Sequence, residues 1–163
     1  MRSKVQVQVL TAMFVALTAV GTLFLSFRGT TGFYHLGDGI FYTAAMLLGP
    51  VAGAIAGGLG GALADTVGGY AVWAPWTLVI KGAAGWVIGS IAMGAAPARR
   101  LAGLLLGALI TVVGYAAATT VMYDWPAAVI EIWGTTLQTL LGIGVAAVLT
   151  PLLGKTLQRT LGR

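Results

Sequence analysis

The chain has 163 residues, of which 58% are hydrophobic and only 8% are charged. A soluble domain carries roughly 25% charged residues, so this composition excludes a protein that faces water on all sides and predicts a single integral membrane domain over residues 1–163. The absence of cysteine excludes disulfides and thiol chemistry, and a single histidine excludes a metal site of several histidines. We expect no metal and no cofactor.

Six apolar segments, separated by charges and by Gly or Pro, are predicted to form the helices of an all-α bundle. They lie at about 5–27, 36–48, 50–68, 75–95, 100–123 and 126–153. A helix needs about 20 apolar residues to cross the hydrocarbon core. The second segment is marginal by this measure, so we expect it to lengthen into residues 33–35 or to be shielded by protein.

The basic residues outside these segments predict how the chain is oriented. With six crossings, both termini and the connection near residue 98 lie on one side of the membrane, and Arg28 lies on the other. The positive-inside rule then places both termini in the cytoplasm. The basic residues on that side are Arg2, Lys4, Arg99, Arg100, Lys155, Arg159 and Arg163. We therefore expect the lipid bilayer, and not nucleic acid, to be the partner of this positive charge.

The third segment, "GPVAGAIAGGLGGALADTVGG", carries glycine at every fourth position from Gly49 to Gly61. Residues four apart lie nearly above one another on a helix, so these glycines form a smooth groove along one face. Helices in lipid associate through close backbone approach. The same spacing recurs at Gly85 and Gly89 and at Gly103 and Gly107, which predicts a tightly packed bundle.

Asp65, Lys81 and Glu131 are charged residues within these segments, at a similar depth toward the outer side. A charge near the bilayer centre is unfavourable by ~2.5–3.5 kcal/mol, so each one indicates a functional site. Two interpretations stay open: a structural lysine–carboxylate pair that joins helices, or the polar floor of an outward-facing pocket. Glu131 and Gln138 share one helix face with Thr135.

Most of the Trp and Tyr residues gather at the outer end instead of forming belts at both interfaces, and this favours the pocket. They are Tyr34, Tyr70, Trp73, Trp76, Tyr123, Trp125 and Trp133. Aromatic walls with a few polar groups suit a flat heterocycle. We expect Lys81 and Glu131 to contact it, with Asp65 nearby.

Further residues complete the predicted site. The rings of Trp73, Tyr123 and Trp125 would close over the ligand, and Tyr34, His35 and Gln138 would also line the site. His35 is equally compatible with a solvated loop. Asp38, in "YHLGDGI", and Asp124, in "YDWPAAV", are expected to cap the helices that follow them.

Two stretches, "TAMFVALTA" and "YHLGDGIFYTAAMLLGPVAGAIAGGLGGALADTVGGYAVWAPWTLVIKGAAGWVIG", resemble the substrate-specific subunit, or S component, of energy-coupling factor (ECF) vitamin transporters. The resemblance implies six helices, cytoplasmic termini, an outward-facing high-affinity site and a multi-pass place in a prokaryotic-type plasma membrane. It also implies that Ala12 and Ala16 dock against a transmembrane coupling subunit, which works with two ATPase subunits. The run from "LADTVGGY" onward looks most like the branch for riboflavin, hydroxymethylpyrimidine and pyridoxine.

Three classes of function therefore compete. The first is a vitamin-binding transport subunit without catalysis of its own. The second is an intramembrane enzyme that uses Asp65, Lys81, Glu131 or His35 as acid or base, although no spacing of nucleophile and base supports it. The third is a structural membrane assembly protein. The chain has no GxxxxGK[ST] motif, so it is not expected to hydrolyse ATP by itself.

Overall fold

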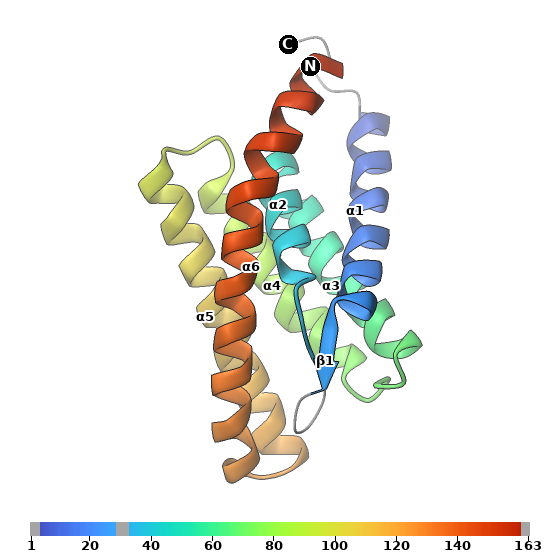
Figure 1. The fold of residues 1–163 in the computed structure, drawn as a ribbon, viewed down its shortest axis with the longest axis vertical. Coiled ribbons are helices and arrows are strands. Elements are labelled where there is room, and N and C mark those ends of the chain that lie inside the picture. Colours follow the sequence, from blue (N-terminus) through green and yellow to red (C-terminus); the bar gives the residue numbers. More distant parts are fainter. Residues whose placement is uncertain (1–3, 29–32, 161–163) are drawn as a thin grey trace.

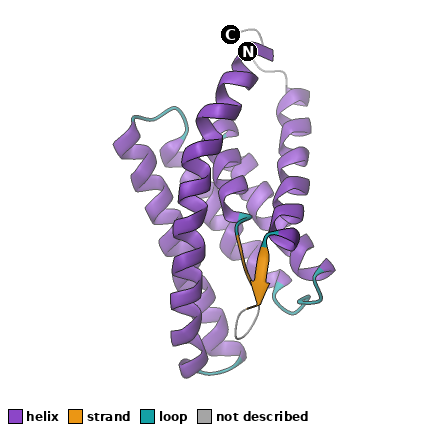
Figure 2. Cartoon of the chain, viewed as in Figure 1, coloured by secondary structure: helices purple, strands orange, loops and turns teal. Residues whose placement is uncertain are grey.

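The computed structural model describes residues 4–28 and 33–160, which form six helices and one two-stranded sheet (Figure 1; Figure 2). The helices are α1 (Lys4–Phe24), α2 (Asp38–Leu48), α3 (Pro50–Val67), α4 (Ala74–Ala92), α5 (Pro97–Met122) and α6 (Trp125–Thr160). The strands are β1 (Ser26–Arg28) and β2 (Phe33–His35). Each helix corresponds to one predicted segment, and α6 extends to Thr160, beyond the predicted end at residue 153.

Proline and glycine explain several of these boundaries. Pro50, Pro75, Pro97 and Pro126 stand in the first turn of α3, α4, α5 and α6, where the missing N–H is not needed and the fixed φ angle suits the helix. Gly49 separates α2 from α3 with a φ angle of +99°. Because glycine adopts this conformation without a steric penalty, the chain turns there without a loop.

The segment before α2 differs from the prediction. Residues 33–35 do not lengthen the helix; they form β2, which pairs antiparallel with β1 so that Ser26 lies opposite His35. The short α2 is instead enclosed by protein, and eight of its eleven residues are buried. It packs against α1, α3, α4 and α6. The hairpin thereby directs His35 into the interior, where the side chain is only 5% exposed.

The glycine stripe of α3 packs closely against α4, in agreement with the predicted tight packing of the bundle. A Cβ added to Gly53 would lie 2.6 Å from the carbonyl oxygen of Gly85, and one added to Gly57 would lie 2.8 Å from that of Lys81. Gly85 in turn lies against the backbone of Gly53. These contacts are too close for any side chain, so glycine is required for the two backbones to approach.

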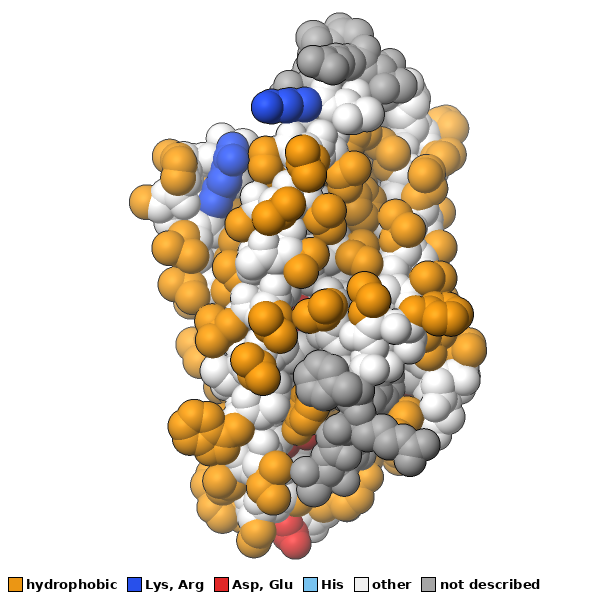
Figure 3. All heavy atoms as spheres, in the orientation of Figure 1, with side chains coloured by type: hydrophobic (Ala, Val, Ile, Leu, Met, Phe, Trp, Pro, Cys, Tyr) orange, Lys and Arg blue, Asp and Glu red, His pale blue; other side chains and the backbone are white. Residues whose placement is uncertain are grey.

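The described chain has the surface of a membrane protein. Four helices, α1, α3, α5 and α6, are long and apolar enough to cross a membrane. Hydrophobic side chains are spread along the whole length of the visible face, and the Lys and Arg side chains on it lie at one end (Figure 3). The beginning of α1 and the end of α6 also lie at that end (Figure 1).

Candidate functional site

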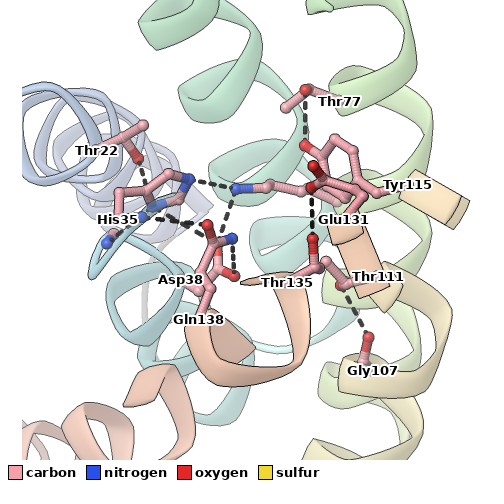
Figure 4. A network of polar contacts seen from close by, with 12 residues as sticks. Thr22, His35, Asp38, Thr77, Gly107, Thr111, Tyr115, Glu131, Thr135 and Gln138 are labelled. Atoms are coloured by element: carbon pink, nitrogen blue, oxygen red, sulfur yellow. Dashed lines mark hydrogen bonds and ion pairs between the residues drawn. The ribbon is translucent and has the colours of Figure 1, made fainter. Parts of the chain in front are cut away.

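A buried ion pair between α4 and α2 lies at the centre of the site. The Nζ of Lys81 lies 2.8 Å from the Oδ1 of Asp38 and 2.8 Å from the Nε2 of His35 (Figure 4). The exposed fractions are 1% for Lys81, 0% for Asp38 and 5% for His35. Lys81 therefore forms its ion pair with Asp38 and not with Asp65 or Glu131, because the fold brings Asp38 within 2.8 Å of it.

Asp38 also does not act as the predicted helix cap. The N-cap of α2 is Gly37, with no side-chain hydrogen bond to the helix, and Asp38 stands in the first turn. Its carboxylate instead contacts Lys81 of α4 and Gln138 of α6. Asp124, in contrast, does cap α6, since its Oδ1 accepts a hydrogen bond of 2.8 Å from the N–H of Ala127.

Gln138 of α6 joins the ion pair to the hairpin. Its Nε2 donates to the Oδ2 of Asp38 at 2.8 Å, and its Oε1 accepts from the backbone N–H of His35 at 3.1 Å. The backbone N–H of His35 sets the orientation of the Gln138 amide, and the amide in turn orients the carboxylate of Asp38. Strand β2 and the helices α2, α4 and α6 thus meet in one hydrogen-bonded cluster.

The imidazole of His35, in β2, faces more hydrogen-bond donors than it can accept from. Burial, followed by the positive charge of Lys81, lowers the pKa of His35 to about 3, so the ring is neutral near pH 7. A neutral imidazole has only one nitrogen that can accept. Yet the N–H of Gly37 faces Nδ1 at 3.1 Å while Lys81 faces Nε2. One of these two donors therefore lacks a full acceptor in the ring.

Glu131 of α6 anchors a second group of polar contacts. Its Oε1 accepts from the hydroxyl of Thr135 at 2.7 Å, and its Oε2 accepts from the hydroxyl of Tyr34 at 3.4 Å. The ring of Tyr34 lies directly over Gly134, where a side chain would collide with it. Glu131, Thr135 and Gln138 are all buried, which confirms the predicted polar face of α6.

Tyr115 of α5 connects these groups with the α3–α4 seam, the line along which the glycines of α3 pack against α4. Its hydroxyl lies 2.7 Å from the Oγ1 of Thr77, and its ring centroid lies 5.9 Å from the Nζ of Lys81 (Figure 4). The ring of Trp73 lies 5.9 Å from that of Tyr115 and stacks on that of Tyr123 at 6.1 Å. Aromatic rings therefore border the polar cluster on its α4–α5 side.

Asp65 of α3 lies beside this aromatic group. It is 7% exposed, and its Oδ2 is buried without a hydrogen-bond partner among the described residues. The side chain of Thr77 neighbours its carboxylate. A buried carboxylate oxygen without a donor is unfavourable.

The structure brings together most of the predicted site residues, but not all. Tyr34, His35, Lys81, Glu131 and Gln138 meet in the two clusters, and Asp65 and Trp73 lie on their α3–α4 side. Tyr123 reaches the group through Trp73, although it is 50% exposed, whereas Trp125 is 63% exposed and has no described contact with the cluster.

Asp38 and Tyr115 are central residues that the predicted site did not include. Asp38 is one of only four acidic residues in the chain, but Asp124 is another and does cap a helix, so this scarcity alone did not separate the two roles. The described residues contain no group of three His, Asp or Glu side chains that could hold a metal ion.

Comparisons with known proteins find a matching family model and two similar proteins. A family model described as "ECF-type riboflavin transporter, S component" matches residues 2–156. The thiamine precursor transporter HmpT of Lactococcus lactis subsp. cremoris is 33% identical over 150 residues, which cover 90% of this chain and 87% of that protein. A protein of Pyrococcus woesei, named only as an uncharacterized protein in a gap 3' region, is 38% identical over 113 residues, covering 69% and 76% of the two chains.

Proposed function

We propose, from the premise that this chain belongs to the S components of ECF-type riboflavin transporters, that its buried polar cluster binds the vitamin or vitamin precursor to be taken up. The chain is a membrane-embedded, substrate-binding transport subunit and not an enzyme. S components act with an ECF module.

The buried contact between Lys81, Asp38 and His35 carries the proposal. A charge inside a membrane helix is unfavourable by ~2.5–3.5 kcal/mol, and a buried ion pair seldom repays the loss of solvation. A bundle that needed only packing would have apolar residues here. Polar groups from β2, α2, α4 and α6, bordered by Trp73 and Tyr115, have the composition of a ligand site.

The ligand that we propose is a small, flat, nitrogen-containing heterocycle. The matching family model concerns riboflavin, and HmpT is named as a transporter of a thiamine precursor. Riboflavin, hydroxymethylpyrimidine and pyridoxine all have rings with hydrogen-bonding edges. The aromatic side chains can stack on such a ring while the polar cluster pairs with its edge.

We propose that all six helices cross the plasma membrane, with both ends of the chain in the cytoplasm and the polar cluster toward the outside. Ala12 and Ala16 are exposed on α1, and we propose that they contact a transmembrane coupling subunit, which in turn works with two ATPase subunits. Small residues there permit close helix approach.

A binding titration of the purified chain in detergent tests the site. Lys81→Met and Glu131→Gln should each weaken ligand binding by ~1.5–3 kcal/mol, the range for hydrogen bonds to charged groups. This corresponds to a factor of roughly ten to over a hundred in Kd. Tryptophan fluorescence can follow the binding of riboflavin, hydroxymethylpyrimidine, pyridoxine and pantothenate.

Lys155→Met is the matched control, because Lys155 is exposed near the end of α6. It removes the same charge and should leave the affinity unchanged. If folded Lys81→Met and Glu131→Gln proteins bind the ligand as tightly as the wild type, these residues hold helices together and do not form the site.

A further inference from the structure

The amide of Gln138 is held on both sides by the chain itself. Its Nε2 donates to the Oδ2 of Asp38 on α2, and its Oε1 accepts from the backbone N–H of His35 on β2. The side chain is buried, and the distances of 2.8 and 3.1 Å are those of well-formed hydrogen bonds. From the sequence we expected Gln138 to line the site, whereas in the fold both polar atoms of its amide already have partners in the chain.

The carboxylate of Asp38 passes this orientation on to Lys81. Gln138 holds one oxygen of Asp38, and the other oxygen, Oδ1, lies 2.8 Å from the Nζ of Lys81. The last torsion of an aspartate side chain is soft, so a carboxylate with one partner can rotate and present either oxygen to a lysine. With Gln138 in place, the carboxylate is held at both oxygens and its direction toward Lys81 is fixed.

The bond to His35 gives these contacts a fixed starting point. It uses a backbone N–H, whose direction is set by the rigid peptide plane, and His35 lies opposite Ser26 in the paired hairpin. The imidazole of His35 also lies 2.8 Å from the Nζ of Lys81. His35 is therefore connected to Lys81 twice, directly through Nε2 and indirectly through Gln138 and Asp38.

These contacts determine where Lys81 can donate. An ammonium group has three N–H donors, and among the described residues Lys81 reaches the Oδ1 of Asp38 and the Nε2 of His35. Because the three donors are tetrahedrally arranged, fixing two of them fixes the direction of the third. The third donor is the one that a ligand bound at Lys81 would use.

We infer that Gln138 is a positioning residue for ligand binding, which does not touch the ligand and strengthens binding by fixing Asp38 and, through Asp38, the third N–H of Lys81. The inference rests on the proposed function, in which Lys81 binds the ligand, and adds a residue that acts through it. A residue that touches the ligand by itself keeps its effect when Lys81 is removed, whereas a residue that acts through Lys81 loses it.

A double-mutant cycle separates these two roles. The wild type, Gln138→Met, Lys81→Met and the double variant are titrated in detergent with riboflavin, hydroxymethylpyrimidine and pyridoxine. Gln138→Met should weaken binding roughly five- to thirty-fold in the wild-type background and less than about twofold in the Lys81→Met background. Gln8→Met is the matched control, because Gln8 is exposed on α1, and it should leave the affinity unchanged in both backgrounds.

A second measurement needs no variant, so it applies even if Gln138→Met does not fold. His35 is the only histidine, so a chain labelled with isotopic histidine gives one backbone amide signal in NMR. Ligand binding should slow the hydrogen exchange of this amide at least about tenfold, because it tightens the contacts that lead from Lys81 through Asp38 to Gln138. Unchanged or faster exchange with ligand bound would contradict the inference, since Gln138 would then not hold His35 in the complex.

The cycle also distinguishes a failure of the inference from a failure of the proposed function. If Lys81→Met weakens binding but Gln138→Met has the same effect in both backgrounds, or none in the wild type, the proposed site stands and the positioning role of Gln138 is wrong. If folded Lys81→Met binds as tightly as the wild type, the proposed site is wrong and the inference fails with it. Failure of the folded wild type to bind any of the three ligands would overturn both.

Discussion

Lys81 is a lysine that the surrounding chain keeps almost entirely from solvent, with 1% of its surface exposed. Its charge is compensated by Asp38, whose second oxygen is held by Gln138. Removing one partner from such a pair leaves a buried charge without compensation, which is more unfavourable than never having had the pair. Residues of this cluster therefore act together, and a single substitution is best interpreted beside a matched one elsewhere.

His35 gives a prediction that can be tested by pH alone. Its pKa is lowered to about 3 by burial and by Lys81, whereas an unfolded histidine titrates near ~6.5. Below that pH the unfolded chain binds a proton that the folded chain does not. The free energy of unfolding should therefore be constant above pH ~6.5 and should fall by up to ~1.4 kcal/mol per pH unit below it.

Denaturant unfolding of the detergent-solubilised chain between pH ~5 and ~7.5 measures this slope. His35 is the only histidine, and model carboxyl groups titrate near ~4. His35→Gln should accordingly remove most of the dependence. Equal slopes for the wild type and this variant would show that His35 is not held neutral in the interior.

At the scale of helices and strands, the sequence was a good guide where long apolar segments were interrupted by Pro or Gly. The start of each helix lies within a few residues of its prediction, because an apolar run and a proline are local signals. The β1–β2 hairpin was missed. Strands of three residues, such as Phe33–His35, have no periodic pattern that could be recognised.

The missed hairpin also explains why the site was only partly predicted. Their depth along the predicted helices placed Lys81 and Glu131 in one layer, and both take part in the buried polar contacts. The partner of Lys81 could not be found in this way, because the hairpin sets where α2 begins and thus where Asp38 lies. Which carboxylate reaches a lysine depends on tertiary packing, and the spacing of residues in one chain does not contain that information.

The α3–α4 seam predicts unequal effects at two glycines of one helix. A Cβ at Gly85 would collide with the backbone of Gly53, whereas the nearest described atom to a Cβ at Gly82 lies 3.8 Å away. Gly85→Ala should destabilise the chain by ~1–3 kcal/mol. Gly82→Ala should be neutral or slightly stabilising, because alanine favours a helix. Thermal unfolding of both variants in detergent compares them, and similar melting temperatures would contradict this account of the seam.

Helix α1 predicts a separation of binding from transport. Val5, Val9 and Val20 are at least half exposed and share a stripe with Ala12 and Ala16. Ala16→Trp should abolish vitamin uptake by the assembled transporter and leave ligand binding by the isolated chain nearly unchanged, since a bulky ring prevents close helix approach.

Val113→Trp on α5 is the control, because Val113 is 57% exposed on another helix. It should support normal uptake. Loss of ligand binding in Ala16→Trp would instead make this stripe part of the internal packing of the chain.

At the scale of the whole molecule, both ends of the described chain lie at one end of the bundle, with basic side chains around them (Figure 3). The connection between α3 and α4 should then face outward, and that between α4 and α5 should face the cytoplasm. The chain has no cysteine, so Val72→Cys and Ala98→Cys each introduce a single thiol whose labelling can be measured by itself. An impermeant thiol reagent added to intact cells should label position 72 and not position 98. The reverse pattern would refute the orientation.

The central claim is that the ligand occupies the cluster around Lys81 and Glu131, and protection of one introduced thiol tests it most directly. In Tyr34→Cys, the thiol replaces a partly exposed side chain whose hydroxyl contacts Glu131. Its modification in the purified chain should slow at least about tenfold when a saturating vitamin is bound, because the ligand excludes the reagent. Val113→Cys, at an exposed position of α5, should react at the same rate with and without ligand. If tryptophan fluorescence shows that the ligand is bound while the thiol at position 34 reacts at an unchanged rate, the ligand lies elsewhere and the account of the site is wrong.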